Sequence, residues 1–258
     1  MAENTKVAES KRDFGLLLSD KLDLVKDGLP ANFNKTRFVQ NCIAFLNEDA
    51  EKYKKFSKEL ILANLVRASY LGLDYMSKEC YLVPFKGKLT FMTSYTGSMK
   101  LAKRYSTRPI LDLYAKVIRD GDTFEESIVD GKPSVNFKPK FLNDGEIIGA
   151  FAVVIYKDGG TGYEVMSKAD IENTRKHSNS PNSPAWTSYY SEMAKKTVLR
   201  RLCKSIDLEF ENATQQGIFN EEAAIETDPV KENEIIVEAE ANTVDFEEFD
   251  ADESGDPK

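Results

Sequence analysis

The sequence predicts an α+β fold, in which a small antiparallel core of strands, arranged as a meander or as hairpins, is packed with helices. Apolar residues recur at helical spacing near both ends of the first 220 residues, whereas strand-like apolar runs cluster between them. Clustered strands favour an antiparallel sheet over the alternating units of a doubly wound fold. With 41% apolar and 30% charged residues, the chain of 258 residues has enough apolar side chains for a folded core.

Helices are expected first along the chain. Residues 1–32 are predicted to be a mobile N-terminal segment with a short amphipathic helix over residues 14–25, where apolar side chains follow helical spacing. Asn34 and Ser57 are each predicted to cap a helix, because their side chains can accept hydrogen bonds from the unpaired N–H groups of a helix start. The second of these helices is expected to end at Gly72, since glycine readily takes the left-handed conformation.

Strands dominate the middle of the chain. The predicted strands are residues 80–85, 89–93, 110–118, 147–156 and 163–166, with short strands or an extended hairpin over residues 124–141. The run 147–156 is nearly all apolar, so we expect it to be the central strand. Helices are predicted again over residues 96–105 and 187–206, and Ser167-x-x-Asp170 resembles a capping box that opens another helix.

Charge is spread unevenly along the sequence. Residues 221–258 hold 15 acidic and 2 basic side chains, a net formal charge of −13, whereas the preceding 220 residues have a net charge of +5. Residues 221–258 are therefore predicted to be a disordered acidic tail. Residues 33–220 are predicted to form the functional core. Because the tail accounts for the low overall pI, that pI does not argue against nucleic acid as a partner.

Several classes of protein are excluded by missing patterns. No apolar run is long enough for a membrane span, and the polar N-terminus lacks a secretory signal, so the expected location is the cytoplasm. Three widely spaced cysteines and a single histidine, His177, predict neither a disulfide framework nor a metal cluster. No P-loop occurs, and the strand that follows Asp144 has Ile155 where a metal-dependent nuclease would need a carboxylate. We therefore expect no cofactor.

The segment from Lys195 to Lys204 carries the most concentrated positive charge. On a helix, Lys196, Arg200 and Lys204 lie one turn apart on a single face with Arg201 beside them, while Lys195 falls among apolar residues on the opposite face. Like charges one turn apart destabilise a helix, so this arrangement favours binding of an external anion such as phosphate. A solvated helix face is the alternative. The predicted contacts are Lys195, Lys196, Arg200, Arg201 and Lys204.

A second basic stretch runs from Tyr81 to Arg104 and contains no acidic residue. It interleaves cations, which can follow a phosphate backbone, with aromatic residues, which can stack on unpaired bases. Most of these aromatic side chains are expected to alternate into the core instead. The predicted nucleic-acid contacts in this stretch are Lys86, Lys88, Tyr95, Lys100, Lys103 and Arg104.

Aromatic residues mark two further segments. Trp186, the only tryptophan, follows a polar loop and could either stack on a base or anchor that loop onto the domain; it is kept among the candidate contacts. In the tail, Phe246 and Phe249 lie among acidic residues, a pattern typical of segments that dock a partner protein. A tail that only improves solubility is the alternative.

Two stretches of the sequence carry a resemblance to a known family. The first stretch consists of Gly72-Leu73-Asp74, Tyr81–Lys88, Tyr95-Thr96-Gly97 and Leu101–Arg104. The second consists of Ser183-Pro184-Ala185-Trp186 and Glu192–Arg201. Both resemble the RecT family of phage single-strand annealing proteins, relatives of the lambda Red beta protein, and the resemblance covers about residues 33–220. One position departs from the family, because Ser94 stands where its turn often has a glycine, and serine has less conformational freedom.

The resemblance implies ATP-independent annealing of complementary DNA strands by rings or helical filaments of the protein. It also implies a partner exonuclease, a host single-strand binding protein, a DNA groove lined by the basic helix and the hairpin segment, and a tail that docks partners. We therefore expect a homo-oligomeric annealing protein that is not an enzyme. The alternatives are a passive single-stranded DNA-binding adaptor that recruits a nuclease through its acidic tail, and a divalent-metal nuclease.

Overall fold

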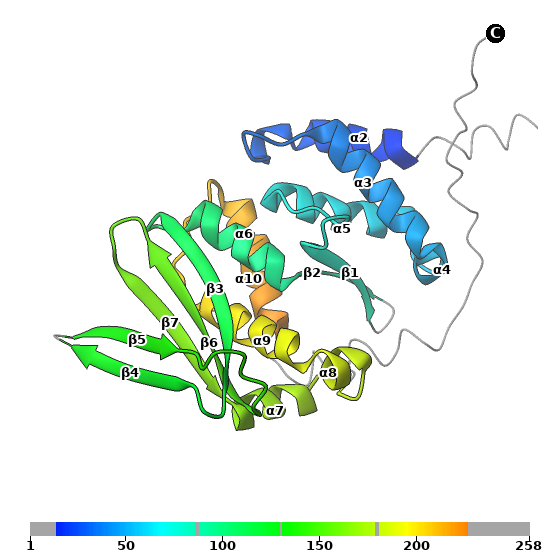
Figure 1. Ribbon diagram of the computed structural model, residues 1–258. Helices are drawn as coiled ribbons and strands as arrows, with labels where there is room; N and C mark the ends of the chain where they lie inside the picture. Colours follow the sequence, from blue (N-terminus) through cyan, green and yellow to red (C-terminus); the bar gives the residue numbers. More distant parts are fainter. Residues whose placement is uncertain (1–13, 86–87, 130, 179–180, 227–258) are drawn as a thin grey trace, which may run out of the picture. The chain divides into compact units, whose positions relative to one another are not determined.

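The computed structural model describes residues 14–85, 88–129, 131–178 and 181–226, and it divides the chain into two compact units. Among the described residues, the first unit takes in residues 14–92 and 212–225, and the second takes in residues 93–211. Helices and strands occur in both units (Figure 1).

The first unit is mainly helical. Its elements are α2 (Phe14–Leu24), the 3-10 turn η1 (Lys26–Gly28), α3 (Lys35–Glu48), α4 (Ala50–Tyr53), α5 (Lys58–Leu71), β1 (Cys80–Phe85), β2 (Lys88–Thr93) and α10 (Ala213–Glu226). The predicted caps are confirmed: the side chain of Asn34 accepts a hydrogen bond from the Arg37 N–H at 2.9 Å, and that of Ser57 accepts one from Leu60 at 3.2 Å. Gly72 ends α5 with a φ of 64°, as its left-handed role requires.

The structure adds detail at both ends of the predicted core. Helix α2 was expected inside a mobile segment, but it packs against α3 and α5 and buries Leu18 and Leu22. Helix α10 continues to Glu226, past the predicted start of the tail, and Arg67 of α5 forms an ion pair with Glu221 at 2.5 Å. Burial of apolar faces therefore extends the folded part at both ends. The rest of the tail lies outside the described residues.

The second unit combines helices with antiparallel strands. Its elements are α6 (Tyr95–Tyr105), β3 (Ile110–Arg119), β4 (Thr123–Val129), β5 (Lys132–Lys138), β6 (Ile147–Tyr156), β7 (Thr161–Ser167), α7 (Lys168–Lys176), α8 (Pro184–Ser188) and α9 (Tyr190–Lys204). Strands β3, β6 and β7 form an antiparallel sheet in which β6 is central, as predicted. Strands β4 and β5 form the predicted hairpin. The mixture of helices and antiparallel strands agrees with the α+β class.

Strand β6 is apolar throughout because both of its faces are covered. Ala150, Ala152 and Val154 belong to a core that also contains the apolar face of α9, whereas Phe151 and Val153 pack toward the β4–β5 hairpin. The Phe151 ring lies 5.1 Å from that of Phe124 and 4.9 Å from that of Phe137, between ring centroids. Small alanine side chains on the helix side let α9 approach the sheet closely, so β6 fixes the position of that helix.

The last predicted helix, residues 187–206, is in fact two helices. Tyr189 leaves helical geometry, with φ −124° and ψ 40°, and separates α8 from α9. The break lets Trp186 on α8 and Tyr190 on α9 pack together with ring centroids 6.1 Å apart. Periodicity alone did not reveal it, because one distorted residue barely changes the spacing of apolar positions.

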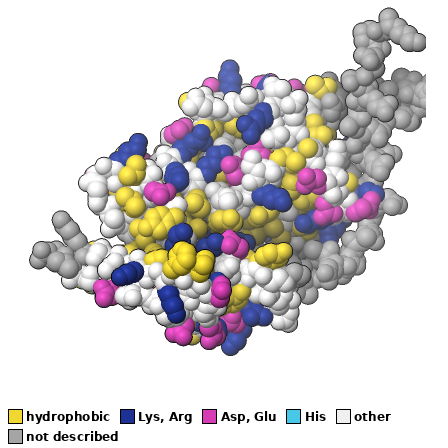
Figure 2. All heavy atoms as spheres, in the orientation of Figure 1, with side chains coloured by type: hydrophobic (Ala, Val, Ile, Leu, Met, Phe, Trp, Pro, Cys, Tyr) yellow, Lys and Arg dark blue, Asp and Glu magenta, His cyan; other side chains and the backbone are white. Residues whose placement is uncertain are grey.

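Some apolar side chains remain at the surface of each unit. Figure 2 shows hydrophobic side chains gathered over the strands of the second unit, with charged side chains interspersed around them. Phe141 and Leu142, in the loop before β6, are 87% and 80% exposed. In the first unit, Leu16 and Leu24 on α2 are also exposed.

Candidate nucleic-acid interface

Helix α9 has the two faces that its sequence predicts. Ala194, Val198, Leu199, Leu202 and Cys203 are buried against the sheet and α6. The opposite face carries the cationic stripe, which consists of Lys196, Arg200, Arg201 and Lys204. Lys196 and Arg200 are half-buried, whereas Arg201 and Lys204 are exposed, and the stems of such long side chains can cover apolar surface. The predicted segregation of charge on this helix is confirmed.

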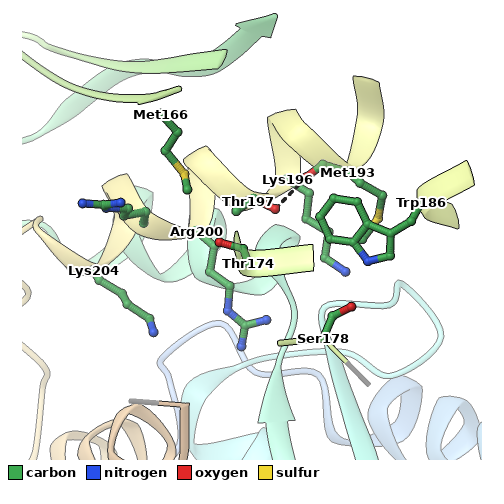
Figure 3. A pocket seen from close by; sticks show the side chains of 10 residues that line it. Met166, Thr174, Ser178, Trp186, Met193, Lys196, Thr197, Arg200 and Lys204 are labelled. Atoms are coloured by element: carbon green, nitrogen blue, oxygen red, sulfur yellow. Dashed lines mark hydrogen bonds between the residues drawn. The ribbon is translucent and has the colours of Figure 1, made fainter. Parts of the chain in front are cut away.

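The cationic stripe forms one wall of a pocket of about 330 Å³ within the second unit. Its other walls come from β7, α7 and α8, and the lining residues are Met166, Thr174, Ser178, Trp186, Met193, Lys196, Thr197, Arg200, Arg201 and Lys204. In Figure 3 the side chains of Lys196, Arg200 and Lys204 extend to the same side of α9. The lining residues include four cations and no carboxylate. The pocket is therefore suited to an anion.

An apolar patch complements these charges. Met166 and Trp186 are almost fully buried and Met193 is half-buried. Figure 3 shows Met193 next to the Trp186 ring. The Thr197 hydroxyl donates to the Met193 carbonyl at 2.8 Å, which directs the hydroxyl to its own helix. A ligand that fills the whole pocket would need both negative charge and apolar surface.

One member of the stripe has an acidic partner that the sequence did not reveal. Arg201 Nε lies 2.7 Å from the carboxylate of Glu164 on β7. The Arg201 side chain is 57% exposed and that of Glu164 is 24% exposed, so this pair is open to solvent screening. Along the sequence, the acidic residues nearest to the stripe are Glu192 and Asp207. Glu164 is distant along the chain and only the sheet brings it to α9.

Lys195 is separated from the pocket. Its ammonium group pairs with Glu192 at 2.6 Å, three residues earlier on α9, and it is not a lining residue. This agrees with its predicted position on the other side of the helix. Of the five cations predicted on this helix, the structure brings four together.

Trp186 anchors α8 rather than offering a stacking face. The indole is 4% exposed and belongs to the core that includes α9. Next to it, burial and the Glu172 carboxylate raise the pKa of Tyr190 to about 12, so this phenol is neutral at physiological pH. With so little of the indole exposed, its ring faces are not open for stacking on a base in this conformation.

The second predicted stretch is divided between the two units. Lys88 is exposed on β2 of the first unit, and Lys86 lies outside the described residues. In the second unit, Lys103 and Arg104 are exposed on α6, Lys100 is half-buried, and Tyr95 packs against the core. None of these residues lines the pocket, as far as the described residues define it.

The departure at Ser94 does not disturb the turn before α6. Ser94 has a φ of −78°, which any residue can adopt, and its hydroxyl accepts a hydrogen bond from the Gly97 N–H at 3.1 Å. The serine therefore caps α6, and glycine's wider conformational freedom is not needed there.

No group of three or more His, Cys, Asp or Glu side chains that could hold a metal is present in the described part of the chain. His177 is the C-cap residue of α7, and its ring Nδ1 lies 2.7 Å from the Asn173 carbonyl oxygen. The three cysteines are buried and form no disulfide, and burial raises the pKa of Cys203 to about 12. Among the described helices, none is long and apolar enough to cross a membrane.

Fold and pocket together define an α+β protein with a cationic binding surface on one helix. The chain belongs to the RecT family, whose sequence model matches residues 36–237. It is also similar to Protein RecT of Escherichia coli (strain K12), with 35% identity over 158 residues. That alignment covers 57% of this chain and 57% of the relative, so the chain spans little more than half of that protein's length. The family expected from the two sequence stretches is thereby confirmed.

Proposed function

We propose that this protein binds single-stranded DNA and anneals complementary strands without ATP, as a homo-oligomeric ring or helical filament in phage recombination. The observation that carries this proposal is the pocket of the second unit, where Lys196, Arg200, Arg201 and Lys204 converge and no lining residue is acidic. Membership of the RecT family supports it. No step requires a bond to be made or broken by the protein, so it acts as a binding protein and not as an enzyme.

The proposed mechanism rests on phosphate contacts. Lysine and arginine side chains on α9 hold the backbone of the first strand, and backbone contacts carry no sequence information, so any strand can be loaded. The bases stay accessible to a second strand, and Watson–Crick pairing then supplies the specificity. Lys88 in the first unit and Lys100, Lys103 and Arg104 on α6 are proposed as additional backbone contacts, whereas buried Trp186 is assigned to positioning α8.

Assembly and partners are part of the same proposal. Each unit has exposed apolar side chains that offer surfaces for self-association. Examples are Leu24 on α2, which is 80% exposed, and Phe141 before β6, which is 87% exposed. The acidic tail, with Phe246 and Phe249, is proposed to dock an exonuclease and the host single-strand binding protein; both phenylalanines lie outside the described residues.

A passive adaptor is the second candidate, favoured by the acidic tail. It would bind one strand and recruit a nuclease, and it would not accelerate pairing. The two functions are separated by adding two complementary labelled oligonucleotides one after the other, without nucleotide triphosphate, and following duplex formation. Annealing predicts faster pairing and tighter retention of the new duplex than of a preformed duplex. Strand binding with no faster pairing would leave only the adaptor, and magnesium-dependent cleavage would indicate a nuclease.

A further inference from the structure

The pocket on α9 has more apolar character than a phosphate backbone requires. A backbone contact needs cations and hydrogen-bond donors, which Lys196, Arg200 and Lys204 supply. The methionines Met166 and Met193 add polarizable apolar surface in the same pocket. A ligand that uses the whole pocket would be an anionic chain that also carries apolar side chains.

The chain itself contains such a segment. Residues 245–250 read Asp-Phe-Glu-Glu-Phe-Asp, four carboxylates and two phenylalanines in six positions. The surrounding tail, residues 221–258, has a net formal charge of −13. The negative charge of this segment therefore complements the cations of the pocket, and its phenylalanines complement the apolar surface of the pocket.

We propose that residues 245–250 of the same chain occupy the α9 pocket when no DNA is bound. One of the two phenylalanine rings packs against Met166 and Met193, and the neighbouring carboxylates pair with Lys196, Arg200 and Lys204. The segment thereby competes with DNA phosphates for the same cations. This last consequence, though not the docking itself, rests on the proposed DNA-binding function of the pocket.

A long linker joins the segment to α10. Eighteen residues separate Glu226, the end of α10, from Asp245. Fully extended they span about 60 Å, and as a flexible coil their root-mean-square end-to-end distance is about 23 Å. Because the segment and the pocket belong to the same chain, docking needs no second molecule, and a tethered segment docks at a higher effective concentration than a free peptide.

This arrangement would couple partner binding to DNA binding. A partner that captures Phe246 and Phe249 withdraws the segment from the pocket and frees the cations for a strand. The two phenylalanines serve both contacts, so the two contacts exclude each other.

Direct docking is tested by photo-crosslinking in the full-length chain. A benzoylphenylalanine replaces Phe246, the protein is irradiated without DNA, and crosslinked peptides are mapped by mass spectrometry. Crosslinks to α9 or to β7 near Met166 are expected, and they should be lost when single-stranded DNA is added. In a mixture of isotopically light and heavy protein, the crosslinks should join peptides of the same copy. Crosslinks only elsewhere, or only between copies, would overturn the proposal.

A charge-neutral variant tests the competition with DNA. The double substitution Phe246→Ala/Phe249→Ala leaves every tail charge in place, and we expect it to raise single-stranded DNA affinity about three- to tenfold, because an occupied pocket lowers the apparent affinity by its free fraction. The matched control is Ile235→Ala/Ile236→Ala, which removes two other apolar tail residues and should change nothing. Pocket crosslinks combined with unchanged DNA affinity would uphold the docking and contradict the DNA-binding role of the pocket. Unchanged affinity without pocket crosslinks would overturn the docking itself.

Discussion

Helices α6 and α9 lie in the same unit and pack against each other, and both carry cations one turn apart. On α6 these are Lys100 and Arg104, and on α9 they are Lys196, Arg200 and Lys204. The cations of α9 line the pocket described above, in which β7, α7 and α8 add walls around that helix, and the cations of α6 do not line it. Spacing in the sequence therefore identifies a cationic face, whereas neighbouring elements decide whether that face becomes a binding site.

The largest expected effect comes from removing the α9 cations. The triple variant Lys196→Ala/Arg200→Ala/Lys204→Ala should weaken single-stranded DNA binding about 100-fold, since each charge-assisted contact contributes on the order of 1 kcal/mol. The fold should persist, because the substitutions relieve repulsion between like charges on one helix face. Fluorescence anisotropy with a labelled oligonucleotide gives the affinity, and thermal unfolding monitors the fold.

The matched control removes the cations of α6. Lys100→Ala/Lys103→Ala/Arg104→Ala deletes the same number of charges outside the pocket, and we expect affinity to fall less than about tenfold. If this variant loses as much affinity as the α9 variant, net charge rather than the pocket determines binding, and the distinction between the two helices fails.

An intermediate effect is expected at Trp186, which supports the wall of the pocket without offering its ring to DNA. Trp186→Phe should lower the free energy of unfolding by about 1–3 kcal/mol, because a smaller ring leaves space in a packed core. Affinity for DNA, measured where the variant is fully folded, should stay within about twofold of the wild type. A large loss of affinity at unchanged stability would instead indicate base stacking.

The smallest expected effect concerns the Arg201–Glu164 pair. Glu164→Gln removes the carboxylate that lies 2.7 Å from Arg201 Nε, so Arg201 becomes available to phosphate and affinity should rise about threefold. Glu146→Gln is the control, since Glu146 pairs with Lys168 away from the pocket lining. Lower affinity in the Glu164 variant would mean that this carboxylate is needed to hold Arg201 in place.

Local patterns predicted local structure well. Asn34, Ser57 and the Ser167–Asp170 box all cap helices as expected, because the partners of a cap lie within three residues. Strand β6 was recognised as central because a strand covered on both faces is apolar throughout. These features depend only on residues that are close together in the sequence, so the sequence alone predicts them.

Features that depend on distant residues were not predictable. The pairing of Glu164 with Arg201 and the return of α10 to the first unit both join residues far apart in the sequence. The division into two units likewise could not be predicted from composition, because the sequence around the boundary between residues 92 and 93 does not have the composition of a linker. The sequence thus predicted the cationic face of the site but not the elements β7, α7 and α8 that surround it.

The salt dependence of binding tests the central claim most directly. Contacts to about five phosphates per subunit predict a slope near −3.5 for log affinity against log salt, about −0.7 for each single-strand phosphate. The Lys196→Ala/Arg200→Ala/Lys204→Ala variant should then show a slope less steep by about 2. Equal slopes for the wild type and this variant would contradict the claim that the α9 face neutralises the phosphates of the bound strand.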